Sequence, residues 1–264
     1  MSTVLLTNDD GVNSPTLPPL AHALERFGEV RTVVPSTERS WIAKAISRFD
    51  PLVVRAVECD GLWMHSVSGT PADCVNLAVH SLLPPLRPDF VVSGVNLGLN
   101  YGLAFLLSSG TIGAAVEAHL AGLRAVAISM AIPADAYGLT GAHRAELIGE
   151  QTGVVAEVAA DIVSDLIDES FPPGVDLFSV NLPAGVTLYT PRVVTSVTRC
   201  RYGRIFVPGP DGEYLHRFSA LEAVEAGGDM AVVDAGQVAI TPLCLDVSTT
   251  VPDRLRAKLE RSDR

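Results

Sequence analysis

Two adjacent carboxylates follow a short apolar run near the start of the chain. The segment Thr7-Asn8-Asp9-Asp10-Gly11 ends the run 4–7, which has the composition of a buried strand. Two neighbouring carboxylates repel each other unless a cation or a proton lies with them. Oxygen ligands of this hard type suit Mg²⁺, Mn²⁺ or Ca²⁺. A solvated turn is the other interpretation, because Asp-Gly pairs are common turn formers.

Two further segments have the composition of ligand-contacting loops. Residues 93–100 (SGVNLGLN) follow an apolar run, and small residues there let backbone amides approach a ligand while Asn96 supplies a neutral oxygen. Residues 108–111 (SSGT) precede a helical pattern, where exposed amides and hydroxyls favour an anion. A loop selected for its turn angles and a simple helix cap are the alternatives. Together, the three segments provide what phosphoryl transfer to water requires.

The elements around these segments predict a layered α/β fold. Short apolar runs alternate with helical patterns, and near-continuous apolar strands between helices are typical of a parallel sheet covered on both faces. We expect strands at 4–7, 30–34, 89–93 and 125–129, and helices at 18–27, 72–83 and 111–121. The sequence therefore predicts a doubly wound sheet, in which ligands lie beyond the carboxyl ends of the strands.

The second half of the chain changes its pattern after one long amphipathic helix. That helix is expected at 143–168, and strands at 176–182 and 237–241. Between them, 187–218 combines β-type segments with Gly and Pro turns, which predicts an extended hairpin projecting from the main domain. The charged segment 252–264 is expected to be a terminal helix or tail.

The composition argues against several classes of protein. The chain has 264 residues, 48% of them hydrophobic, and a formal net charge of −11. So acidic a chain is a poor candidate for binding nucleic-acid polymers, because such binding requires positive charges that neutralise the phosphates. Its four scattered cysteines predict reduced thiols rather than a disulfide or zinc framework. We find neither a secretory signal nor an uninterrupted apolar span, and we expect a soluble cytoplasmic protein that does not bind membranes.

Seven short segments, in order along nearly the whole chain, carry a resemblance to a known family. They are LLTNDDG at 5–11, VPSTERS at 34–40, SGTPADCV at 68–75, VSGVNLGLN at 92–100, SGTIGAA at 109–115, VNLP at 180–183 and ITPL at 240–243. On these segments the chain resembles the SurE survival proteins, which are metal-dependent nucleoside monophosphate phosphatases. The resemblance implies hydrolysis of nucleoside 5′-monophosphates, with 3′-monophosphates left open.

The resemblance also implies a set of site residues. One divalent ion per subunit, Mg²⁺ or Mn²⁺ (Ca²⁺ in crystals), would be held by Asp9, Asp10, Ser40 and Asn96. Phosphate contacts would come from Asn100, Ser109, Gly110 and Thr111. Asp9 and Asp10 are then the catalytic carboxylates, one of which would accept the proton of the attacking water. Ser40 enters only through the resemblance, because local pattern allows Arg39-Ser40 to start a helix.

The resemblance further implies an architecture and an assembly. We expect one domain over 1–264, made of a Rossmann-like core (1–185), an extended β-hairpin region (186–220) and a C-terminal strand with a helix or tail (221–264). The hairpin and a C-terminal segment are exchanged between subunits in this family, so a homodimer or tetramer is implied.

Two positions depart from the family pattern. Trp41 stands where a glycine usually follows Ser40, and its indole could narrow the pocket, stack on a base or simply pack against neighbours. Ala104 stands where an aspartate usually lies four residues after Asn100, in a segment (103–108) that is one residue longer than usual. These departures keep open a catalytically weakened, nucleotide-binding descendant.

Two other enzyme classes fit less well. An aspartyl-phosphate phosphatase with Asp9 as nucleophile usually carries D-x-D rather than the D-D found here. A Rossmann dehydrogenase requires G-x-G-x-x-G after the first strand, and the sequence has none there.

Overall fold

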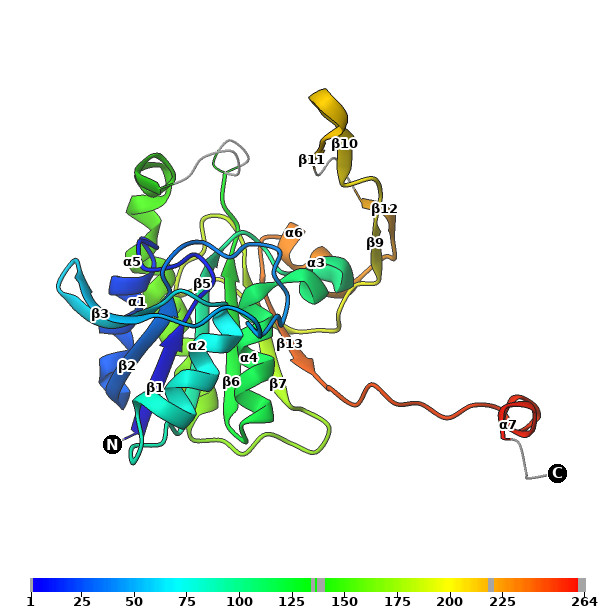
Figure 1. Ribbon diagram of the computed structural model, residues 1–264, viewed down its shortest axis with the longest axis horizontal. Helices are drawn as coiled ribbons and strands as arrows, with labels where there is room; N and C mark the ends of the chain where they lie inside the picture. Colours follow the sequence, from blue (N-terminus) through cyan, green and yellow to red (C-terminus); the bar gives the residue numbers. More distant parts are fainter. Residues whose placement is uncertain (1, 134–135, 137–140, 218–220, 261–264) are drawn as a thin grey trace.

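The structure is a computed structural model, and it describes residues 2–133, 136, 141–217 and 221–260. Its centre is a nine-stranded mixed sheet with the order β3-β4-β2-β1-β5-β6-β7-β13-β8 (Figure 1). The strands are β1 (Ser2–Thr7), β2 (Gly28–Pro35), β3 (Val54–Cys59), β4 (Leu62–Val67), β5 (Phe90–Leu97), β6 (Arg124–Met130), β7 (Leu177–Leu182), β8 (Arg192–Val194) and β13 (Val238–Leu243). The inner strands from β4 to β7 run parallel, while β3 and β13 are antiparallel to their neighbours β4 and β7.

Helices cover both faces of the sheet, as the sequence predicts. On one face lie α1 (Leu17–Leu24) and α5 (Gly141–Ile167), and on the other lie α2 (Pro71–Leu77) and α4 (Gly110–Leu120). The smaller helices are α3 (Gly102–Ser108), α6 (Gly228–Asp234), α7 (Asp253–Leu259), the 3₁₀ turns η1 (Glu25–Phe27) and η4 (Pro210–Gly212), and a π-helical turn η2 (Ala78–Leu82) that continues α2.

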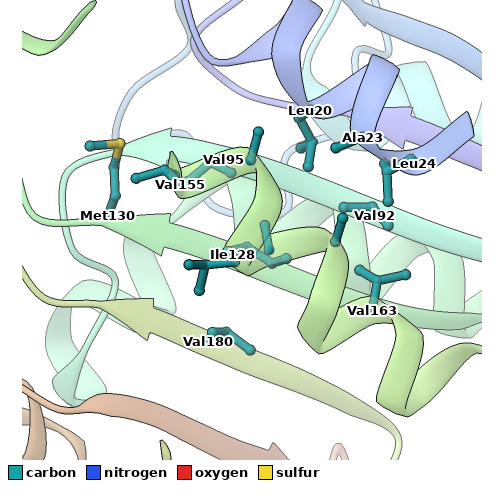
Figure 2. Packing of buried hydrophobic residues seen from close by; sticks show 14 of the residues in the cluster. Leu20, Ala23, Leu24, Val92, Val95, Ile128, Met130, Val155, Val163 and Val180 are labelled. Atoms are coloured by element: carbon teal, nitrogen blue, oxygen red, sulfur yellow. The ribbon is translucent and has the colours of Figure 1, made fainter. Parts of the chain in front are cut away.

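The inner strands are apolar on both faces because each face is covered. Along β5, Val92 joins the core beneath α1 and α5, whereas its neighbour Val91 joins the core beneath α2 and α4. Figure 2 shows the first of these cores, with Val92 and Ile128 of the sheet facing Leu20 and Val163 of the helices. Successive side chains of a strand point to opposite faces, so a buried inner strand reads as a continuous apolar run.

The expected hairpin region, 186–220, begins too early and ends too early. Its first strand, β8, pairs in parallel with β13 and so belongs to the central sheet. The strand β9 (Cys200–Tyr202) pairs with β12 (Leu221–Val224), which lies beyond the expected range. The projecting arm seen in Figure 1 has the pair β9 and β12 at its base, and β10 (Phe206–Pro208) and β11 (Tyr214–His216) form the hairpin at its tip.

The end of the chain leaves the sheet. After β13, an extended segment carries α7 far from the rest of the molecule (Figure 1). Within the described residues, no single helix is long and apolar enough to cross a membrane. The helices α3 and α4 reach that length and hydropathy only if the two, which are bent against each other, are counted as one span.

Candidate active site

Three segments meet beyond the carboxyl ends of β1 and β5. Asp9 and Asp10 follow β1, and the backbone N–H of Leu97, at the end of β5, donates to Asp10 Oδ2 at 3.1 Å. From the first turn of α4, the hydroxyl of Thr111 donates to Asp9 Oδ1 at 2.7 Å. The three motifs that the sequence singles out are therefore joined by hydrogen bonds into one site.

Burial strongly perturbs the carboxylate of Asp9. Asp9 is only 5% exposed, and this burial raises the pKa of its carboxyl group from 3.8 to about 6. The hydrogen bond from Thr111 opposes that rise, while the negative charge of Glu38 adds to it. An ionised carboxylate in such a place is destabilised unless a cation accompanies it.

The oxygen atoms around Asp9 fit a hard divalent cation. Asn96 uses its Nδ2 to donate to the carbonyl of Gly98 at 2.6 Å, which leaves Oδ1 as its ligand atom. The hydroxyl of Ser40 donates a hydrogen bond to Oε1 of Glu38 at 2.6 Å. The described part of the chain contains no cluster of three or more His, Cys, Asp or Glu side chains, so a zinc-type set is absent there. Carboxylate, amide and hydroxyl oxygens are ligands suited to Mg²⁺ or Mn²⁺.

These residues border a cavity of about 990 Å³. Five of the eight predicted site residues line it: Asp9, Ser40, Asn96, Asn100 and Ser109. The other three, Asp10, Gly110 and Thr111, do not belong to this lining. Asp10 accepts a hydrogen bond from Leu97, and Gly110 and Thr111 adjoin Asp9. The remaining wall is largely apolar and aromatic, with Glu38, Ser108 and His216 as its polar members. Its apolar and aromatic residues are Trp41, Leu97, Leu99, Tyr101, Phe105, Tyr202, Leu221, Val224 and Met230.

The beginning of α4 is built to approach Asp9 closely. Ser109 caps the helix by accepting a hydrogen bond from the N–H of Ile112 at 3.1 Å. A Cβ at Gly110 would lie 3.0 Å from Asp9 Oδ2, so a larger residue would push the helix away from the carboxylate. The first N–H groups of an α-helix have no partner inside the helix, and they attract anions.

Asn100 is held from two sides. Its backbone N–H donates to Asn181 Oδ1 at 2.8 Å, and its Nδ2 donates to the hydroxyl of Ser129 at 2.8 Å. Sequence reasoning missed Asn181 and Ser129 as supports of the site. Asn181 lies in the VNLP segment, which signalled the family but not this contact.

The loop that carries Ser40 and Trp41 is anchored on α4. A Cβ at Gly113 would lie 2.4 Å from the carbonyl oxygen of Ala43, so the loop backbone rests directly on the helix. Beside it, Lys44 forms a 2.6 Å ion pair with Glu117, which is buried and also accepts from Asn76 at 2.8 Å. These anchors have no local sequence signal, because they join residues far apart in the chain.

Comparison with known proteins identifies the family. The model of the family described as survival protein SurE matches residues 4–205. This chain belongs to the SurE family.

Two relatives named "5'-nucleotidase SurE" illustrate the similarity. One, from Methanocella arvoryzae, is 34% identical over 93% of this chain and 92% of its own length. Another, from Geobacter sulfurreducens, is 36% identical over 93% of this chain and 88% of its own. The crystal structure of SurE protein from Aquifex aeolicus covers 98% of this chain and 100% of its own, with a TM-score of 0.77 and 28% identity. The predicted family and fold class are confirmed.

Both departures from the SurE pattern border the cavity or its wall. The segment 103–108, which is one residue longer than usual for the family, lies in helix α3. The carbonyl of Ala104 accepts hydrogen bonds from the hydroxyls of Tyr202 at 2.5 Å and Ser108 at 3.2 Å. Trp41 lines the cavity and is 42% exposed.

Proposed function

We propose that this chain is a metal-dependent 5′-nucleotidase, which hydrolyses nucleoside 5′-monophosphates to nucleoside and phosphate. The observation that carries the proposal is one cavity with two kinds of wall. Asp9, Asn96 and Asn100 line it with polar atoms, and the same cavity has an apolar, aromatic wall. A phosphate monoester of a nucleoside has the same division into a charged end and a flat, less polar end.

We propose that a divalent ion, Mg²⁺ or Mn²⁺, binds to Asp9, Asp10, Ser40 and Asn96. The buried carboxylate of Asp9 and the neutral oxygens beside it support this assignment. When bound there, such an ion would neutralise charge on the substrate phosphate and lower the pKa of a water molecule.

The protein groups perform the remaining steps. The oxygen of a water forms the new bond to phosphorus while the bond to the ribose oxygen breaks. Asp9 or Asp10 accepts the proton of that water, which then passes to the leaving oxygen. The N–H groups of Gly110 and Thr111 stabilise the charge on the phosphoryl oxygens from the positive end of α4, and the side chains of Ser109 and Asn100 assist them.

We further propose a homodimer or tetramer in which the C-terminal segment is exchanged between subunits. None of the residues of α7 is buried in the single chain, which supports a partner for this segment. The free state of all four cysteines supports a reducing, cytoplasmic location.

The proposal is tested by phosphate release from a panel of nucleoside 5′- and 3′-monophosphates with Mg²⁺, Mn²⁺ or EDTA. We expect release that requires the metal and favours 5′-monophosphates. Nucleotide binding without any release, by folded and metal-supplied protein, would instead support the weakened, binding-only descendant.

A further inference from the structure

A cluster of aromatic rings lines the same cavity as Asp9 and Asn100, and separate parts of the chain build it. Trp41 comes from the loop after β2, Phe105 from α3 and Tyr202 from β9. The ring centroid of Trp41 lies 6.1 Å from that of Phe105 and 5.3 Å from that of Tyr202. The ring of His216, at 4.7 Å from Trp41, completes the cluster from β11.

Trp41 occupies a backbone conformation that favours glycine. Its φ is 58°, in the left-handed region, where a bulky side chain costs free energy. A glycine, which usually follows the serine in this family, would carry no such cost. Strain of this kind persists where the surrounding structure imposes it, and it is concentrated at functional sites. Here the strained residue presents an indole to the cavity beside the metal-ligand candidate Ser40.

The substrate has one part that matches this wall. Nucleic-acid bases stack on aromatic side chains irrespective of base identity, because every base has a π-face. The phosphate and ribose have no comparable flat surface. An aromatic wall in the cavity that holds Asp9 and Asn100 is therefore suited to the leaving nucleoside rather than to the phosphate.

We propose that Trp41, supported by Phe105 and Tyr202, is the base-stacking subsite of this enzyme. It selects phosphate monoesters with a nucleobase over sugar phosphates without one. The inference rests on the proposed nucleotidase function, and it makes Trp41 a specificity-determining residue rather than a packing residue.

The first test compares AMP with ribose 5-phosphate, which is the same monoester without the base. In Trp41→Gly, we expect kcat/KM for AMP to fall by about tenfold or more, mainly through KM. The value for ribose 5-phosphate should stay the same. Removing the strained side chain leaves a glycine where φ is positive, so this variant is expected to fold. Trp63→Ala is the matched control, since Trp63 lies on β4, is 71% exposed and does not line the cavity.

The second test reads binding without turnover. The chain has two tryptophans, so Trp63→Phe leaves Trp41 as the only indole. Titration of this variant with adenosine, in the presence of metal, should quench its fluorescence in a saturable way, and ribose should not. Trp41→Phe, in which only Trp63 reports, should show no saturable quenching.

The outcomes separate the subsite from the reaction. The base-stacking proposal would be refuted if Trp41→Gly kept the preference for AMP over ribose 5-phosphate and adenosine did not quench Trp41. The proposed nucleotidase activity would still stand. Quenching by adenosine without phosphate release from any substrate would refute the proposed nucleotidase activity and support the base-stacking subsite.

Discussion

Replacing Asp9 by asparagine should make the metal-free protein more stable and inactive at the same time. The side chain keeps its shape and its carbonyl oxygen, which still accepts the hydrogen bond from Thr111. It loses the negative charge that burial disfavours. The substitution therefore separates what the carboxylate costs the fold from what it contributes to metal binding.

The size of the effect follows from the pKa of Asp9. Burial raises that pKa from 3.8 to about 6 in the folded, metal-free protein. Below about pH 4 both the folded and the unfolded chain hold the proton. Between pH 4 and 6 the unfolded chain loses it first, so the free energy of unfolding falls as pH rises. Above pH 6 the full penalty is present, and it amounts to about 3 kcal/mol.

The assay is thermal unfolding in EDTA from pH 4 to pH 8. At pH 8, we expect Asp9→Asn to melt about 6 °C above the wild type, at about 2 °C per kcal/mol for a chain of this size. Near pH 4 the two curves should meet. Adding Mn²⁺ should stabilise the wild type, because the ion binds only the folded state, and should leave the variant unchanged.

Asp50→Asn is the control for loss of one negative charge, because Asp50 is exposed in the loop before β3. It should change neither the pH profile nor the response to Mn²⁺. Equal stability of wild type and Asp9→Asn at pH 8 in EDTA would refute the claim that Asp9 is an uncompensated buried carboxylate.

Three further predictions concern the supports of the site. Gly113→Ala should displace the loop that rests on α4 and lower kcat/KM by about tenfold or more in steady-state kinetics. The control is Gly153→Ala, where the added Cβ meets nothing within 4 Å. It should raise the free energy of unfolding, measured in urea, by about 0.5–1 kcal/mol. Thr111→Val removes a hydrogen bond that lowers the pKa of Asp9, so the acid limit of Mn²⁺ binding should move to higher pH in calorimetric titrations, and an unchanged limit would contradict this. Glu117→Ala should lower the free energy of unfolding by about 0.5–1.5 kcal/mol, because Lys44 and Asn76 lose the buried acceptor that they share. A urea midpoint equal to that of the wild type would show the anchor to be unnecessary.

The sequence locates the parts of the site that follow buried strands. Asp9 and Asn96 stand out because apolar runs precede them, and strand ends in a doubly wound sheet converge on one edge. Ser40 has no such signal and entered only through the resemblance to SurE proteins. Its position depends on contacts of its loop with Gly113 and Glu117, which are more than 70 residues away.

The strands that the sequence missed are the ones without a continuous apolar run. β3 has exposed residues along it, because it is the edge of the sheet and its side chains are only partly covered. β8 has three residues, too few for a pattern. The Asp60-Gly61 turn between β3 and β4, with φ of 49° and 79°, was a signal for this hairpin, since Asp-Gly favours such tight turns.

Phosphate release from AMP by EDTA-treated protein, measured as Mn²⁺ is added back, tests the account most directly. The wild type should gain turnover with a saturable dependence on Mn²⁺, and Asp9→Asn, although folded and more stable without metal, should gain none. Turnover in Asp9→Asn equal to that of the wild type at every Mn²⁺ concentration would contradict the central role of this carboxylate.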